Sequence, residues 1–113
     1  TDITNDTISV GIQSLNIDKK LFIESDITKN IHIMSESSAA TIINTAPNVG
    51  EGLKIKGLHI HSSNAGIGAI NNNGTLTLHD VILHQWPGSA TSTITNQTGS
   101  KATMLGNCKI VSN

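Results

Sequence analysis

Apolar and polar residues alternate in short segments along the chain, and these segments repeat. Three of them, 53–63, 76–86 and 103–113, share one order of apolar and polar positions, in which two alternating stretches are separated by a two-residue corner. Alternation with a period of two is typical of β-strands, because successive side chains of a strand point to opposite faces. Each segment is therefore predicted to form two short strands joined at a corner, and helix is excluded.

The repeated positions predict rows of side chains that stack inside the molecule. An earlier copy at 15–25 follows the same order with one additional residue in its corner. The segments that start at 53, 76 and 103 are 23 and 27 residues apart, a step typical of one coil of a solenoid. The side chains expected to point inward are Leu15, Ile17, Leu21, Ile23, Leu53, Ile55, Leu58, Ile60, Leu76, Leu78, Val81, Leu83, Thr103, Leu105, Cys108 and Ile110.

A third strand per coil is predicted between the matched segments, at 40–44, 67–71 and 92–96. Each stretch ends in asparagine, whose amide can bond to the backbone and to amides in the coils above and below. The residues expected to stack in this way are Asn44, Asn71 and Asn96. The pattern thus favours an all-β parallel solenoid. An antiparallel β-sandwich is the alternative, because strands spaced 8–12 residues apart are also typical of that fold.

Composition and charge narrow the classes of partner. The chain has 113 residues, consistent with a single domain over 1–113, and only 13% of them are charged. The formal net charge is -1 and arginine is absent, so nucleic acid is not an expected partner. Cys108 is the single cysteine and forms no internal disulfide. No apolar run reaches the roughly 18 residues of a membrane span, so direct membrane insertion is not expected.

One part of the repeat resembles a known family. Residues 68–70 are Gly-Ala-Ile, 73–74 form an Asn-Gly turn, and Thr and Leu alternate over 75–78. This order resembles the repeats of polymorphic outer-membrane proteins and related bacterial surface adhesins, and 15–33 is similar to the opening coil of such passengers. The resemblance implies a right-handed parallel β-helix that is exported to the bacterial cell surface and acts outside the cell.

An exposed strip is the candidate binding surface. Because Leu58 and Ile60 are expected to point inward, His59 and His61 point outward, and His84 occupies the matching position of the next coil. Elongated solenoids use exposed apolar and aromatic strips for partners, here a glycan or a surface protein of a host or neighbouring cell. A competing interpretation is that a loop at 86–92 covers part of the strip. The candidate residues are Phe22, His59, His61, Ile82, His84 and Trp86.

The same histidines make metal binding an alternative function. Zinc and copper accept imidazole ligands, and two histidines one residue apart on a strand can both contact an ion. No acidic or thiol group is expected beside His59, His61 and His84, so solvated surface histidines without metal or cofactor are the favoured interpretation.

Catalysis is not expected. Glycoside hydrolysis needs two carboxyl groups at a set separation, and no two acidic residues are expected in one column on adjacent coils. Glu24 and Asp26 are the nearest pair. Cys108 falls at an inward position, where a thiol behaves as a small apolar group. A carbohydrate-active enzyme or a polysaccharide-binding accessory domain is kept as the alternative.

The predicted function follows from this architecture. The chain stops directly after a core-type segment, so we expect a segment of a longer secreted protein, or flanking coils or another chain stacked on the open end. The sequence predicts a right-handed parallel β-helix of about four coils. It further predicts a non-enzymatic module of the cell surface or a secreted protein, acting as adhesin stalk, spacer or binding surface.

Overall fold

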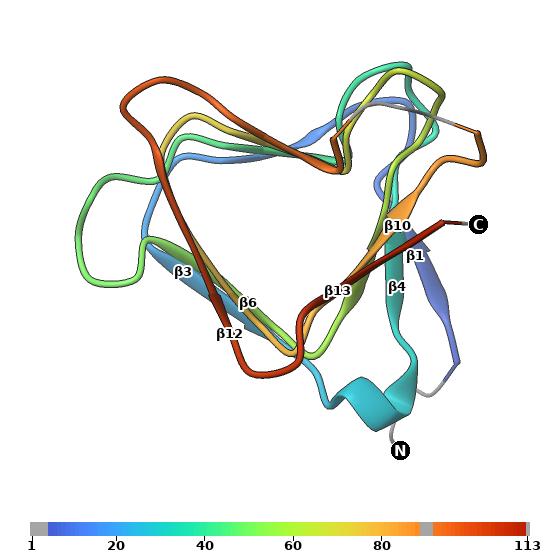
Figure 1. Ribbon diagram of the computed structural model, residues 1–113, viewed down its shortest axis with the longest axis horizontal. Helices are drawn as coiled ribbons and strands as arrows, with labels where there is room; N and C mark the ends of the chain where they lie inside the picture. Colours follow the sequence, from blue (N-terminus) through green and yellow to red (C-terminus); the bar gives the residue numbers. More distant parts are fainter. Residues whose placement is uncertain (1–4, 89–91, 113) are drawn as a thin grey trace.

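The alternating segments form strands that wind into a parallel β-solenoid. The computed structural model describes residues 5–88 and 92–112. Seen along the winding axis, successive coils superpose as a triangle with one sheet on each side (Figure 1). The solenoid has about four turns, as the repeat predicts.

Three sheets build the sides of the triangle. Sheet A contains, in spatial order, β1 (Thr7–Ser9), β4 (His32–Met34), β7 (His59–His61), β10 (Ile82–Gln85) and β13 (Lys109–Ser112). Sheet B contains β2 (Leu15–Ile17), β5 (Ile42–Asn44), β8 (Ile70–Asn72) and β11 (Ile94–Asn96). Sheet C contains β3 (Leu21–Glu24), β6 (Leu53–Lys56), β9 (Thr75–His79) and β12 (Lys101–Leu105). One 3-10 helix, η1 (Ile27–Lys29), lies between β3 and β4.

Every strand pair in these sheets is parallel, which excludes the antiparallel sandwich. The predicted inward column is confirmed by backbone hydrogen bonds between coils. The N–H of His59 donates to the carbonyl of Ile31, that of Ile82 to Leu58, and that of Lys109 to Val81. Consequently Ile31, Leu58, Val81 and Cys108 occupy one stacked position.

Aliphatic side chains fill the interior of the triangle. The predicted inward residues Leu53, Ile55, Ile60 and Leu76 are completely buried. Each fully buried side chain of this size contributes about 1.5–3 kcal/mol relative to an exposed one. The core is therefore built from the period-two pattern of the central coils.

The corner between β6 and β7 needs glycine. Gly57 has φ 71°, in the left-handed region, and a Cβ atom there would collide with the backbone carbonyl of Ser25. Its N–H donates to the carbonyl of His79 at 3.0 Å. Glycine thus allows three successive coils to approach closely at this corner.

In the first coil, the observed pairing of strands differs from the predicted alignment. Leu21 and Ile23 of β3 lie opposite Leu53 and Ile55 of β6, whereas β2 belongs to sheet B. The sheet A strand of this coil is β4, which begins after η1. Residues 26–30 form that helical insert, which is absent from the later coils. Two alternating stretches, β2 and β3, were therefore mistaken for a sheet C and sheet A pair.

The insert has clear local causes. The carboxylate of Asp26 accepts hydrogen bonds from the backbone N–H of Thr28 at 3.0 Å and from its hydroxyl at 2.8 Å. Asn30 ends the helix with φ 54°, a left-handed conformation that asparagine tolerates. Side-chain caps of this kind satisfy backbone groups that a short helix leaves unpaired.

The last described coil is also shifted by one residue in sheet C. Ala102 and Met104 lie opposite Leu76 and Leu78, so the prediction that Thr103 and Leu105 point inward is wrong. The reason is a three-residue corner at 105–107, where the alignment allowed two residues. Met104 is 49% exposed even though it is in register with a buried leucine.

Stacked asparagines line the corner between sheets B and C. Asn72 donates from Nδ2 to Oδ1 of Asn96 at 2.8 Å and accepts at Oδ1 from Nδ2 of Asn44 at 2.9 Å. Asn44 and Asn72 are completely buried. The predicted stack is thus confirmed for Asn44 and Asn96. Asn71 was the wrong middle member, because β8 ends one residue later and Asn71 points away from the stack, accepting from Gln97.

Candidate functional site

Four of the five histidines gather on the outer side of sheet A. The strands that carry them are neighbours: β4 contributes His32, β7 contributes His59 and His61, and β10 contributes His84. His32 lies directly opposite His59, and His84 lies directly opposite His61. On each of these strands the residue next to the histidine points into the core. Because successive side chains of a strand point to opposite faces, the imidazoles point outward. We call these four residues the histidine cluster.

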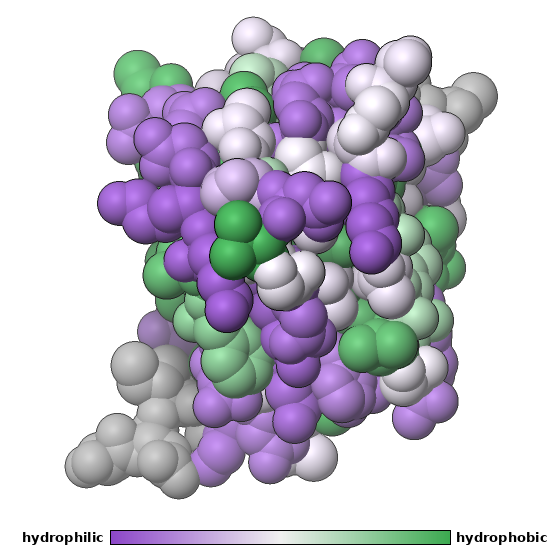
Figure 2. Space-filling view, turned by 90° about the vertical axis from the view of Figure 1, so that its left-hand side faces the viewer, coloured by the Kyte–Doolittle hydropathy of each residue, from purple (hydrophilic) through white to green (hydrophobic). Residues whose placement is uncertain are grey.

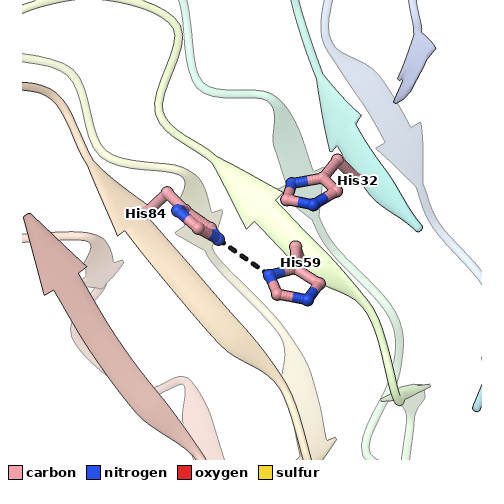
Figure 3. A group of neighbouring side chains, drawn as sticks. All are labelled: His32, His59 and His84. Carbon is pink, nitrogen blue, oxygen red and sulfur yellow. Dashed lines mark hydrogen bonds between the residues drawn. The ribbon is translucent and has the colours of Figure 1, made fainter. Parts of the chain in front are cut away.

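The four rings form two stacks that are joined by short nitrogen contacts. His32 stacks on His59 with ring centroids 4.1 Å apart, and His61 stacks on His84 at 4.0 Å. Nδ1 of His59 lies 2.8 Å from Nε2 of His84 (Figure 3), and Nδ1 of His32 lies 2.6 Å from Nε2 of His61. Each contact has the length of a hydrogen bond, in which one ring donates and the other accepts.

Two of the four rings, His59 and His61, are neutral at pH 7. Burial, together with the neighbouring rings of His32 and His84, lowers the pKa of His59 to about 4. Burial also lowers the pKa of His61 to about 4, again together with neighbouring imidazoles. The pKa of His32 is lowered by burial and then by His84. A charged imidazolium has no acceptor nitrogen, so the accepting ring of each nitrogen contact must be neutral.

His59 carries the one buried imidazole nitrogen without a hydrogen-bond partner among the described residues, Nε2. Only 8% of the surface of His59 is exposed. When Nδ1 of His59 donates to His84, Nε2 presents an unshared electron pair. A buried polar atom of this kind costs free energy unless a ligand or ion satisfies it.

The other predicted strip residues divide between two sheets. Ile82 lies opposite His59 in β10 and is partly buried, and Trp86 directly follows β10 and is 38% exposed. Phe22 lies in β3 opposite Lys54, on sheet C, so its predicted place beside His59 is wrong. The misaligned first coil is the cause. Residues 89–91 of the predicted covering loop lie outside the described residues.

His32 was missed for the same reason. In the correct register, 31–33 (Ile-His-Ile) match 58–60 (Leu-His-Ile). An alignment that allowed an insert of five residues after β3 would have found this match. The structure thus places four histidines in the cluster, whereas the sequence predicted three.

Acidic side chains line a groove at the corner between sheets C and A. A groove of about 530 Å³ is lined by Glu24, Ser25, Asp26, Ile27, Lys56, Gly57 and Asp80. Hydrogen bonds from the backbone and side chain of Thr28 lower the pKa of Asp26. Asp80 accepts from the backbone N–H of Asn107 at 2.9 Å. Asp26 and Asp80 thus hold turns in place, and the lowered pKa of Asp26 is the opposite of what a general acid requires.

Cys108 has the packing expected of a core residue. It is partly buried and packs against the hydrophobic core, and its Sγ lies 3.3 Å from the carbonyl oxygen of Leu105.

The side of the solenoid that faces away from sheet A is mainly hydrophilic, with separate hydrophobic residues (Figure 2). Among the described residues, no helix has the length and apolar character needed to cross a membrane.

Comparison with known protein families, curated proteins and solved structures finds no significant match to this chain. The parallel β-solenoid is consistent with the resemblance to surface passengers at the level of fold. No match supports membership of this chain in that family.

Proposed function

We propose that this chain is a non-enzymatic recognition module of a secreted or bacterial cell-surface protein. In this proposal the coils form a rigid spacer of the adhesin type, and sheet A carries the binding surface. The ligand is a glycan of a host or neighbouring cell. The Gly-Ala-Ile and Asn-Gly motifs that resemble those of exported passengers support the extracellular setting.

The observation that carries the proposal is the concentration of ring side chains on sheet A. The chain has only two aromatic residues of the Phe, Trp and Tyr type, yet four imidazoles and Trp86 come from three neighbouring strands and the residue after β10. Aromatic faces pack against the apolar faces of sugars, and neutral imidazoles donate to and accept from hydroxyl groups. The strand ladder holds these groups rigid, which lowers the entropic cost of binding.

Adhesion of protein-coated beads tests the recognition role. We expect beads that carry residues 1–113 to attach to surfaces coated with mucin-type glycans, and a His84→Ser/Trp86→Ser variant to lose most of this attachment. Phe22→Ser is the matched control, because Phe22 is 52% exposed but lies on sheet C. Attachment that depends on Phe22 and is unaffected by the double change would contradict the proposal.

A cleavage assay tests the non-enzymatic part. We expect no new reducing ends and no unsaturated uronate when the chain is incubated with uronate polymers and calcium. The reason is that Asp26 and Asp80 are engaged in turns around the corner groove. Product formation that is lost in Glu24→Gln or Asp26→Asn would instead establish a carbohydrate-active enzyme.

A further inference from the structure

We propose that His32, His59 and His84 bind one transition-metal ion of the zinc, copper or nickel class on the outer side of sheet A. The inference names a ligand for the surface described above, and it rests on the proposed function only in using that surface. One ring nitrogen from each of these residues lies within 4.8 Å of the others. Figure 3 shows the three rings close together on three adjacent strands, with one nitrogen of His84 directed toward His59.

The buried nitrogen of His59 is an independent reason to place an ion here. Nε2 of His59 is buried and has no partner among the described residues, and the residue as a whole is only 8% exposed. Neutral imidazole nitrogen is a common ligand for these metals. A bound ion would satisfy a polar atom that the protein alone leaves unsatisfied.

The surroundings select the class of metal. Across the strands, the column through His32 and His59 continues to Thr7, Ile82 and Lys109, and His84 lies opposite Val111. No carboxylate occurs in these positions. Calcium and magnesium require oxygen ligands, whereas imidazoles suit zinc, copper and nickel. The imidazole ligands therefore favour zinc, copper or nickel over calcium and magnesium.

Side-chain rotations of His32 and His84 complete the coordination. Zinc–nitrogen bonds of about 2.0–2.1 Å place two tetrahedral ligands roughly 3.3 Å apart. Nε2 of His84 lies 2.8 Å from Nδ1 of His59, so it must leave this contact and turn toward the unpaired Nε2 of His59, while His32 must approach. His32 and His84 are only partly buried, so their rings have room to move, whereas β7 is held between two strands.

His61 orients one ligand without contacting the ion. Its Nε2 lies 2.6 Å from Nδ1 of His32, a contact that engages this nitrogen and leaves the other ring nitrogen of His32 to coordinate. Three protein ligands leave one position open on a tetrahedral ion. A water molecule or a ligand oxygen, such as a sugar hydroxyl, would occupy it.

Calorimetry with zinc chloride tests the site. The untagged chain, residues 1–113, is stripped with a chelator and titrated near pH 7.5 in a buffer that does not bind metals. We expect one zinc ion per chain and binding more than about tenfold weaker in His84→Gln and in His59→Gln. Calcium chloride is expected to give no heat. His79→Gln is the matched control, because His79 lies outside the cluster beside Asp80.

The outcomes separate the alternatives. No heat with folded protein, unchanged affinity in His84→Gln, or equal loss in His79→Gln would each overturn the site. Circular dichroism checks folding, and His84 decides the result if His59→Gln does not fold. Bead attachment in chelator tests the proposed function separately. Attachment without zinc binding would overturn the metal site alone, and zinc binding without attachment would overturn the recognition role alone.

Discussion

Replacing Asn72 by alanine is expected to lower the free energy of unfolding by about 3 kcal/mol or more. The side chain makes four hydrogen bonds in a fully buried position: to Asn96, to the carbonyl of Lys101, from Asn44, and from the N–H of Gly74. Removing one partner of a buried hydrogen bond costs about 1–3 kcal/mol, because the other partner loses its hydration without compensation. Several groups are left unsatisfied at once.

Urea unfolding, followed by the fluorescence of Trp86 and by circular dichroism, measures this loss. Asn71→Ala is the matched control, because the adjacent side chain lies outside the stack and accepts a hydrogen bond from the exposed side chain of Gln97. We expect that change to cost less than about 1 kcal/mol. Equal losses in the two variants would show that the asparagine stack does not stabilise the corner between sheets B and C.

Acidification is expected to lower the free energy of unfolding by about 3 kcal/mol between pH 7 and pH 4. The pKa of His59 and of His61 is about 4 in the folded protein, against a usual value of 6.5. The unfolded chain therefore binds more protons in this window, and stability rises with pH. The loss begins as pH falls through about 6.5 and is complete below about 4. The expected loss of about 3 kcal/mol is that of one such histidine, because two coupled rings contribute less than twice the free energy of one.

Urea unfolding at a series of pH values, with a chelator present, tests this dependence. We expect a His59→Gln/His61→Gln variant to show a much flatter profile, and His79→Gln to follow the unchanged protein. The pKa of Asp26 is lowered from 3.8, so its contribution to stability is lost only at lower pH. A profile that stays steep without the two histidines would assign the acid sensitivity to other groups.

The period-two pattern predicted an all-β fold, and the repetition of whole two-strand units favoured the parallel solenoid that the structure shows. Leu53, Ile55, Leu76 and Leu78 alternate with polar residues, and in the structure they are buried on parallel strands in matching register. The corner was also readable, because glycine between two strands indicates a close approach or a left-handed backbone. These features are local, so they appear directly in the order of residues.

Register in the first and last coils was not readable to the same accuracy. Helix η1 and the corner at 105–107 each add residues between strands, and a loosely matched repeat has no signal for such additions. A shift of one residue exchanges the two faces of a strand, which is why Thr103, Leu105 and Asn71 were placed wrongly.

The sequence by itself determined that the chain is a solenoid with an aliphatic interior and outward-facing His59, His61 and His84. Only the tertiary structure decided that Phe22 lies on another sheet and that His32 completes a cluster with its neighbours. The physical reason is that a binding site depends on which strands become adjacent. Adjacency is set by the cooperative packing of all coils and by the inserts at their corners, whereas alternation within one strand is set by the backbone alone.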